Sequence, residues 1–248
     1  DAEIGVSQNG DAVAAFHVLR HAAPLNWSKA LSLVKRLKGF EIRDAETKKV
    51  IKTYGDASLE FSVFDVNMRS GIGIFSQVNR AQNLNLVEKA LLYAGLAGGE
   101  HVLDLFSGAG NFSLPFARHA KDVIGIEANK QAVEEAKANA AANSVKNASF
   151  HAGDAAAWLK RNLKTLEKNR PAVIILDPPR GGIPPDAAGT LNKLKPDKII
   201  YVSCSPPTLA RDLRTLNGAG YKVFRAGLID MFPQTYHIEC IAGLVRTA

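Results

Sequence analysis

The sequence contains little cysteine. Only two of its 248 residues are cysteines, Cys204 and Cys240. Two cysteines far apart in the chain do not make the disulfide framework of a small secreted protein, so we expect a reducing, cytoplasmic location. Long apolar runs are missing as well, since none approaches the roughly 20 residues that a membrane span needs. The sequence therefore predicts no membrane partner.

The sequence has fewer acidic residues than basic ones. Lys and Arg together number 31 and Asp and Glu 24, which gives a formal net charge of +7 and a pI of about 9.4. This balance fits a polyanionic partner such as nucleic acid, although many basic proteins bind none. The hydrophobic and charged fractions, 46% and 22%, are ordinary for a globular protein. They allow one large domain, or a large and a small one.

Residues 1–74 have the pattern of a small α+β piece. An apolar stretch over 11–21 predicts a strand with no partner before it, and a helical period over 26–37 starts near the candidate cap Asn26. Short strands follow in "FEIRD", "KVIKTYG" and "LEFSVF". The unpartnered strand, together with a start at Asp1 rather than Met, predicts that an N-terminal portion is missing.

Residues 75–248 alternate between strand and helix patterns. Such alternation predicts parallel strands with right-handed crossovers, and hence a doubly wound, mostly parallel, seven-stranded sheet. The final runs "YKVFRAGLIDMF" and "YHIECIAGLVR" have no helix between them, so we expect the last strand to insert antiparallel. Ligands of such sheets bind outside the carboxyl ends of the strands, where the motifs of this sequence fall.

A glycine-rich turn, "DLFSGAGNF" (104–112), follows the first strand of this part and opens a helix. Gly108 and Gly110 permit a tight turn and a close approach of the backbone to a ligand. Glu127 ends the next strand, where a carboxylate can bind both hydroxyls of a ribose. The turn alone is also consistent with a helix start that binds nothing, but the acidic strand end favours a nucleotide site.

S-adenosylmethionine suits this site better than NAD does. The dinucleotide fingerprint needs a third glycine, and Ser113 stands at that position. Asp154, after the third strand, can contact an adenine or a ribose. An acidic rim attracts the sulfonium cation and repels a pyrophosphate. Four strand-end residues make this predicted rim: Asp104, Glu127, Asp154 and Asp177.

The sequence "IILDPPRGGIPP" (174–185) ends the fourth strand. Asp-Pro-Pro at this point is typical of methyltransferases that act on planar nitrogen or base substrates, and the prolines fix the backbone. Arg180 stands where the amine-methylating enzymes have a stacking aromatic residue. Its guanidinium can bind a phosphate or a carbonyl oxygen, and a surface ion pair is the alternative.

Cys204 lies at the end of the fifth strand, just before a helix over 206–217. A buried cysteine is usually a small apolar residue, but a helix N-terminus stabilises a thiolate. Thiolate addition to carbon 6 of a pyrimidine makes carbon 5 nucleophilic enough to attack a sulfonium methyl group. We therefore expect Cys204 to activate a pyrimidine ring.

This reaction also needs a base that removes the carbon 5 proton. "DMFPQTYHIECI" (230–241) offers Asp230, His237 and Glu239. A carboxylate in an apolar strand is costly unless it is paired or used, so Glu239 is the expected base, with an ion pair to arginine as the alternative. His237 is as readily an orienting residue as a catalyst. Cys240 faces the other side of the strand, which predicts a core position.

These motifs together resemble the RNA (uracil-5-)methyltransferase family, which modifies ribosomal and transfer RNA. The resemblance rests on "FSQVN" (75–79), "DLFSGAGNF", "LDPPRGG", "YVSCSPPTLARD" and "DMFPQTYHIE". It implies a Rossmann-like class I S-adenosylmethionine-dependent methyltransferase domain over 75–248, with Cys204 as nucleophile and Glu239 as base. It further implies a set of cofactor-binding residues: Gln77, Phe106, Asn111, Glu127, Asp154 and Asp177.

The resemblance implies methyl transfer from S-adenosyl-L-methionine to carbon 5 of a uridine in RNA, in 23S rRNA rather than in tRNA. Residues 1–74 resemble part of the family's central domain, which helps to hold RNA. Two features common in the family, an N-terminal RNA-binding β-barrel and a four-cysteine iron–sulfur motif, are absent from this sequence. We expect no metal in this chain, an iron–sulfur cluster only in a preceding portion, and a monomer.

Two alternatives stay open. An RNA cytosine-5 methyltransferase also adds a cysteine to its base and carries "DPP" and "SCS" in similar places, but it does not show the "DMFP…HIE" ending. A catalytically idle RNA-binding scaffold would retain the fold. The presence of both Cys204 and Glu239 argues against such a scaffold.

Overall fold

The computed structural model describes residues 1–7, 9–19 and 27–247, and the chain divides into two compact units. Unit 1 comprises Asp1–Ser62 and Asn67–Phe75, and unit 2 comprises Val63–Val66 and Ser76–Ala248. The division near residue 75 falls one residue after the boundary expected from the sequence. It differs further in that 63–66 belongs to unit 2.

Unit 1 contains a four-stranded sheet in the order β1-β2-β3-β4. Its strands are β1 (Ala2–Val6), β2 (Ala12–Val18), β3 (Leu37–Asp44) and β4 (Val50–Gly55). β2 and β3 run parallel, while β1 and β4 pair antiparallel with their neighbours. The strands β5 (Ser58–Val63) and β6 (Val66–Gly71), which connect to unit 2, form a separate two-stranded sheet.

Two expectations for this region were wrong. The strand that seemed to lack a partner is β2, and β1 pairs with it along its whole length. The helix expected over 26–37 is reduced to a 3-10 turn, η1 (Trp27–Lys29), and one helical turn, α1 (Ala30–Leu33). One turn is enough to pack Trp27 and Leu31 against the buried Phe40, after which the chain enters β3. The candidate cap Asn26 lies outside the described residues.

Unit 2 contains the predicted seven-stranded sheet, in the order β12-β13-β11-β10-β7-β8-β9. Its strands are β7 (His101–Leu105), β8 (Asp122–Glu127), β9 (Ala148–Ala152), β10 (Val173–Leu176), β11 (Lys198–Ser203), β12 (Tyr221–Ile229) and β13 (Glu239–Arg246). All run parallel except β13, which is antiparallel to both neighbours. The expected antiparallel insertion of the last strand is confirmed.

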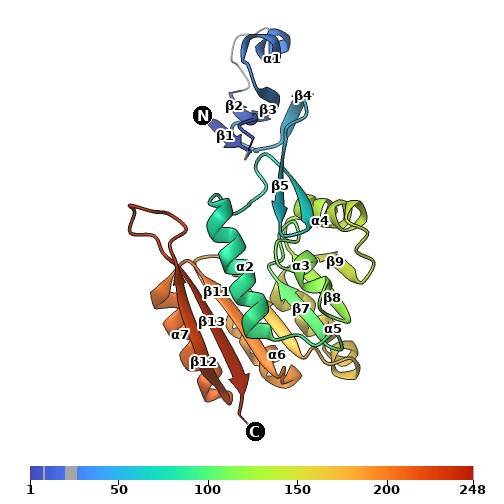
Figure 1. The fold of residues 1–248 in the computed structure, drawn as a ribbon, viewed down its shortest axis with the longest axis vertical. Helices are drawn as coiled ribbons and strands as arrows, with labels where there is room; N and C mark the ends of the chain where they lie inside the picture. Colours follow the sequence, from blue (N-terminus) through green and yellow to red (C-terminus); the bar gives the residue numbers. More distant parts are fainter. Residues whose placement is uncertain (8, 20–26, 248) are drawn as a thin grey trace. The chain divides into compact units, whose positions relative to one another are not determined.

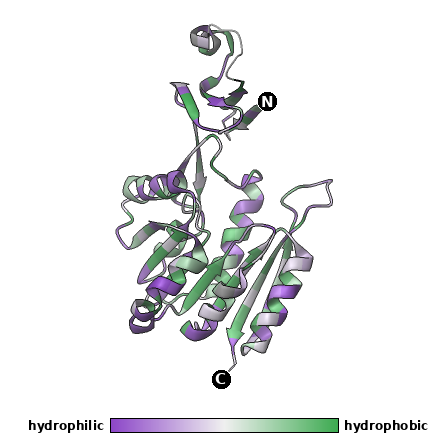
Figure 2. Ribbon diagram, turned by 180° about the vertical axis from the view of Figure 1, so that it is seen from behind, coloured by the Kyte–Doolittle hydropathy of each residue, from purple (hydrophilic) through white to green (hydrophobic). Residues whose placement is uncertain are grey.

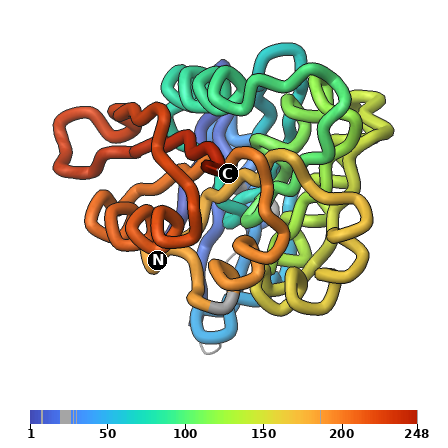
Figure 3. Tube along the Cα trace, turned by 90° about the horizontal axis from the view of Figure 1, so that it is seen from below, coloured from blue at the N-terminus to red at the C-terminus, as the bar shows by residue number. Residues whose placement is uncertain are grey.

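Helices cover both faces of this sheet (Figures 1 and 3). One face carries α2 (Arg80–Ala94), α3 (Ser113–Ala117) and α4 (Lys130–Ala142), and the other carries α5 (Ala155–Lys168), α6 (Pro185–Leu194) and α7 (Pro206–Gly218). Helix α3 is shorter than the expected 111–119. The residues before it form a turn in which Gly108 and Gly110 have positive φ.

The core of unit 2 is formed by the strands themselves. Side chains of β7, β10 and β11, such as Leu103, Ile174 and Ile199, are fully buried between the helical layers. Figure 2 shows the central strands as mostly hydrophobic, as expected when both faces of a parallel sheet are covered. Burial of each such side chain contributes about 1.5–3 kcal/mol. Polar side chains consequently gather at the ends of the strands.

Candidate active site

The register of β11 and β13 brings the two predicted reacting residues together. Ser203 pairs with Cys240 at the end of the antiparallel ladder, and the next step along each strand is Cys204 and Glu239. The carboxylate of Glu239 is close enough to raise the pKa of the Cys204 thiol. Residues from two strands that are far apart in the sequence thus meet at the carboxyl edge of the sheet.

Glu239 is a buried carboxyl group, with 4% of its surface exposed. Burial raises its pKa from 4.5 to about 8, with a further contribution from Asp177. The group is therefore largely protonated at neutral pH. Its neighbour Cys240 is buried in the apolar core, as its place in the strand predicted.

The environment of Cys204 differs from the one expected. Burial and the carboxylate of Glu239 raise the pKa of its thiol, and a hydrogen bond from Arg180 lowers it in part. Helix α7 begins just after Cys204, but its first residues are Pro206 and Pro207, which have no N–H to donate. The thiolate is therefore favoured by Arg180 rather than by N–H groups of the first two helical residues.

Arg180 lies in the loop after β10 and points to two partners. Its guanidinium is near enough to Cys204 to lower the pKa of the thiol in part, and Nη2 donates to Nδ1 of His237 at 3.2 Å. The backbone of the same loop is fixed by α7. Thr208 Oγ1 donates to the carbonyl of Arg180 at 3.0 Å, and Arg211 Nη2 donates to the carbonyl of Gly181 at 2.8 Å.

Asp212, also on α7, fixes the end of this loop from inside the protein. Its side chain is buried and accepts hydrogen bonds from the Ile183 N–H at 2.9 Å and the Tyr201 hydroxyl at 2.6 Å. Gly182 has φ +79° and lies so near that a Cβ there would stand 2.3 Å from Asp212 Oδ2. The "SPPTLARD" motif thus places the residue that contacts Cys204.

The glycine-rich turn contacts the acidic end of β8. Gly108 N–H donates to Glu127 Oε2 at 3.1 Å, and Asn129 N–H donates to Oε1 at 2.8 Å. Phe106, directly after β7, has φ +70°. A non-glycine residue in this region is strained, and such strain is concentrated at binding sites. Two of the predicted cofactor residues, Phe106 and Glu127, therefore lie at one turn.

Asp104 lies beneath this turn rather than on the expected acidic rim. It is fully buried, and Ser113 Oγ donates to its Oδ2 at 2.5 Å. Its Oδ1 is buried without a hydrogen-bond partner in the described part of the chain. Burial raises the pKa of Asp104 to about 7, opposed by the Ser113 hydrogen bond and supported by Asp177. Burial likewise raises the pKa of Asp177, directly after β10, to about 7.

Asn111 is positioned by a residue that the sequence analysis missed. Asn83 on α2, 2% exposed, exchanges two hydrogen bonds with it, at 2.8 and 3.0 Å between side-chain nitrogen and oxygen. A signal was present in the sequence, because Asn83 shares the apolar face of α2 with Leu86, Val87 and Ala90. A polar residue on such a face needs a buried partner.

Two of the predicted cofactor residues, Gln77 and Asp154, lie outside the glycine-rich turn. Gln77 is buried in the segment before α2. Asp154 is exposed and caps α5, accepting a hydrogen bond from the Ala157 N–H at 2.8 Å. Its carboxylate has this structural role whether or not it contacts a ligand.

The residues at this edge fit a cationic nucleoside such as S-adenosylmethionine. The buried Asp104 Oδ1 needs a partner, and a buried carboxyl group is satisfied by a nearby positive charge. A Cβ on Gly108 would meet nothing within 4 Å, so the turn leaves space for a ligand. Among the described residues no His, Cys, Asp or Glu cluster is arranged to hold a metal ion.

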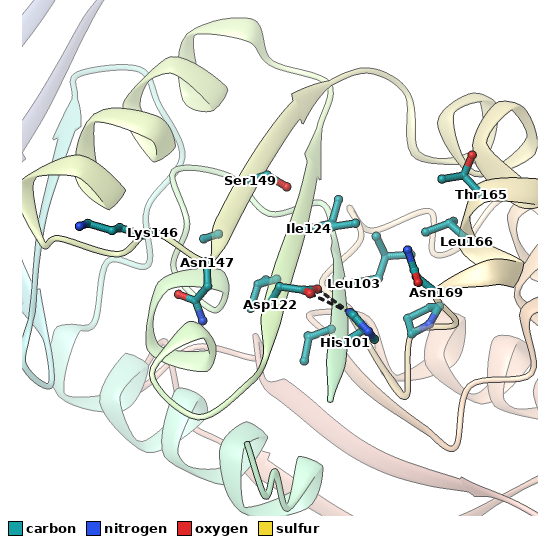
Figure 4. Close-up of a pocket in the computed structure, with 14 residues that line it drawn as sticks. His101, Leu103, Asp122, Ile124, Lys146, Asn147, Ser149, Thr165, Leu166 and Asn169 are labelled. Carbon is teal, nitrogen blue, oxygen red and sulfur yellow. Dashed lines mark hydrogen bonds and ion pairs between the residues drawn. The ribbon is translucent and has the colours of Figure 1, made fainter. Parts of the chain in front are cut away.

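A cavity of about 340 Å³ lies at the opposite end of the sheet. It is lined by residues that begin strands, such as His101 of β7 and Asp122 of β8, which pair at 2.8 Å (Figure 4). A cavity of about 700 Å³ borders the Gly181–Pro185 loop, α6 and α7. The first cavity is separate from the candidate site, and the second adjoins the loop that carries Arg180. No helix in the described ranges is long and apolar enough to cross a membrane.

A similar solved structure shows the class of protein to which this fold belongs. The tRNA (uracil-54, C5)-methyltransferase of Pyrococcus abyssi, in complex with S-adenosyl-L-homocysteine, matches with a TM-score of 0.79 and 27% identity, over 98% of this chain and 58% of that one. The fold is that of a class I S-adenosylmethionine-dependent methyltransferase, as predicted. The chain belongs to the tRNA (uracil-5-)-methyltransferase family, whose sequence model matches residues 26–247.

Curated relatives agree with this assignment. An uncharacterized RNA methyltransferase of Caldanaerobacter subterraneus is 43% identical over 200 residues, which is 80% of this chain and 43% of that protein. The 23S rRNA (uracil(1939)-C(5))-methyltransferase of Photobacterium angustum is 42% identical over 190 residues, 75% of this chain and 84% of that protein. The chain thus spans less than half of the first relative and most of the second.

Proposed function

We propose that this chain transfers a methyl group from S-adenosylmethionine to carbon 5 of a uridine in RNA, through a covalent bond between Cys204 and carbon 6 of the base. The observation that carries the proposal is the placement of Cys204 beside Glu239 at the carboxyl edge of the sheet, with the charge of Arg180 near enough to favour the thiolate. A nucleophile and a base side by side are what a two-stage reaction at one ring requires.

In the first stage the Cys204 thiolate forms a bond to carbon 6, and the electron pair of the C5=C6 bond becomes available at carbon 5. Arg180 favours the thiolate by its charge and its hydrogen bond. When bound, S-adenosylmethionine supplies a methyl group on a positively charged sulfur, which carbon 5 takes up. The products of this stage are the methylated adduct and S-adenosylhomocysteine.

In the second stage Glu239 removes the proton from carbon 5, the C5=C6 bond forms again, and the bond to Cys204 breaks. The net reaction releases one proton, which leaves Glu239 to solvent. A carboxylate whose pKa is raised to about 8 is a stronger base than an exposed one, which suits removal of a proton from carbon. The ionised form of Glu239 is the active one in this stage.

Cofactor binding is assigned to the residues around the glycine-rich turn. Glu127 is oriented by the N–H groups of Gly108 and Asn129 to face a ribose. Asp104 and Asp177 supply negative charge for the sulfonium. The proposed cofactor set is the one expected from the sequence: Gln77, Phe106, Asn111, Glu127, Asp154 and Asp177.

Ribosomal RNA is the proposed substrate. The name of the Photobacterium relative, which is aligned over most of its length, states 23S rRNA, while the Pyrococcus enzyme acts on tRNA. The net charge of +7 suits either RNA, and we propose that the residues up to 74 help to contact it. Methylation of unmodified 23S rRNA and tRNA transcripts, followed by mapping of the methylated nucleotide, tests this choice. Product on tRNA alone would overturn it.

Trapping the covalent RNA complex tests the chemistry. Cys204→Ala should abolish methyl transfer and every covalent complex. Glu239→Gln should slow turnover by about 10²–10⁴-fold and accumulate methylated RNA that stays bonded to the protein after denaturation. The double variant should form no complex, whereas Cys240→Ala, which keeps the nucleophile, should react as the parent does. Turnover of Glu239→Gln at the parent rate would exclude Glu239 as the base.

A further inference from the structure

His237 contacts Arg180, whose charge acts on the reacting cysteine. Arg180 Nη2 lies 3.2 Å from His237 Nδ1, and the same guanidinium is near enough to Cys204 to lower the pKa of its thiol, against the raising effects of burial and of Glu239. Since a guanidinium can only donate, His237 Nδ1 must be the acceptor, and the imidazole proton is then on Nε2. The hydrogen bond therefore exists only while the imidazole is neutral.

Arg180 and His237, the two partners in this contact, are each held in place by further contacts. The carbonyl of Arg180 accepts a hydrogen bond from Thr208 on α7. The His237 N–H donates to Thr235 Oγ1 at 3.2 Å, and its ring packs against Tyr236, with 4.1 Å between ring centroids, and Phe232, with 6.0 Å. A long arginine side chain has many rotamers, so a second anchor at its tip restricts where the guanidinium lies.

We propose that His237 is a positioning residue, whose neutral imidazole holds the guanidinium of Arg180 near the sulfur of Cys204. Protonation of His237 would place two cations face to face and release Arg180 from this position. The inference deepens the proposed function, on which it rests for its role in catalysis. The effect on Cys204 itself is a property of the free protein and can be measured without RNA.

Other charged groups lie near Cys204, and their effect on the reactivity of its thiol must be distinguished from that of His237. Glu239, at the start of β13, raises the pKa of Cys204, and Asp177, after β10, acts on Glu239. A pH profile alone therefore mixes several titrations. A comparison of variants with and without Arg180 isolates the contribution of His237, because His237 is proposed to act only through that side chain.

Alkylation of Cys204 by iodoacetamide in the full chain, followed by mass spectrometry from pH 6 to 10, provides the test. His237→Leu should slow alkylation at pH 7 by on the order of tenfold, because the charge-assisted contact to the sulfur is loosened. His237→Asn, which retains an acceptor near Nδ1, should restore most of the rate. In an Arg180→Ala background, His237→Leu should have no further effect. His119→Leu, an exposed histidine after α3, is the matched control and should react as the parent does.

Thermal unfolding of each variant excludes a change in fold, and His237→Ala serves if the leucine variant is unstable. Parent-like alkylation of His237→Leu and of His237→Ala, or an undiminished effect of His237→Leu without Arg180, would overturn the inference. Methylation by Cys204→Ala would instead overturn the proposed function and leave the alkylation result standing. If Cys204→Ala is inactive and alkylation does not depend on His237, only the positioning role is lost.

Discussion

Asn83 and Asn111 bond to each other through both atoms of their side-chain amides. This pair joins α2, which follows Gln77 in the sequence, to the glycine-rich turn after β7. Two segments that are expected to contact the cofactor are thereby held at a fixed separation. Asn83 is buried and Asn111 is half-buried, so the Asn83 amide cannot exchange its partner for water without opening this part of the fold.

Asn83→Leu should therefore weaken binding of S-adenosylhomocysteine as well as the fold. The substitution leaves the Asn111 amide without its partner, at a cost of about 1–3 kcal/mol in the free energy of unfolding. Calorimetry should show a loss of cofactor affinity in the folded variant. Asn85→Leu, on the exposed side of the same helix, is the control, and equal effects of the two substitutions would refute the positioning role of Asn83.

Gly182→Ala should destabilise the protein, whereas Gly181→Ala should not. At Gly182 the backbone has φ +79° and a Cβ would meet Asp212 Oδ2 at 2.3 Å, while a Cβ on Gly181 meets nothing within 4 Å. A strained backbone conformation of this kind costs about 1–3 kcal/mol. Urea unfolding of the two variants measures the difference, and equal stabilities of the two variants would contradict the strain at Gly182.

The stability of the protein should depend on pH through Glu239. Its pKa is about 8 in the folded chain against an ordinary 4.5, so the folded state binds more protons between these values and its stability falls as pH rises through that range. Glu239→Gln stays neutral. The stability of the variant relative to the parent should increase by up to about 1.4 kcal/mol per pH unit within the window. Denaturant titrations at pH 5, 6.5 and 8 measure it, and a constant difference would contradict the raised pKa.

Binding of the sulfonium cofactor should strengthen as pH rises through neutrality. Burial raises the pKa of Asp104 and of Asp177 to about 7, so both ionise near that pH, and a cation is attracted to their charged forms. S-adenosylhomocysteine, which lacks the charge, serves as the matched ligand. We expect the affinity for S-adenosylmethionine to rise relative to that for S-adenosylhomocysteine between pH 6 and 8, as measured by calorimetry. Asp177→Asn should reduce this dependence on pH.

The sheet of unit 2 could be predicted from sequence because its strands are continuous apolar runs bounded by chemically distinctive residues. Cys204, Glu239 and Glu127 each stand at a strand end, and parallel strands bring such ends to one edge. The pattern could not show that Asp104 lies beneath the turn, because one residue along a strand changes the face to which a side chain points.

Contacts between side chains from distant segments could not be predicted in this way. The apolar face of α2 indicates that Asn83 needs a buried partner but does not identify Asn111, and the contact of Arg180 with His237 depends on loop conformations that leave no periodic signal. The structure of unit 1 was harder to predict from the sequence for a different reason. Its short strands and the single turn of α1 are stabilised by contacts such as that of Trp27 with Phe40, and these override the local helical pattern.

The order of strands also determines when the sheet of unit 2 becomes complete during synthesis. β13 follows every other strand of unit 2 in the sequence but lies between β11 and β12. Until it leaves the ribosome, β12 has no neighbour in the sheet and β11 presents an unpaired edge, which is a template for aggregation. A nascent chain, or one truncated by a premature stop codon before residue 239, would carry Cys204 with no carboxylate beside it. The pairing that brings Glu239 beside Cys204 can therefore form only after the last strand of the sheet has been synthesised.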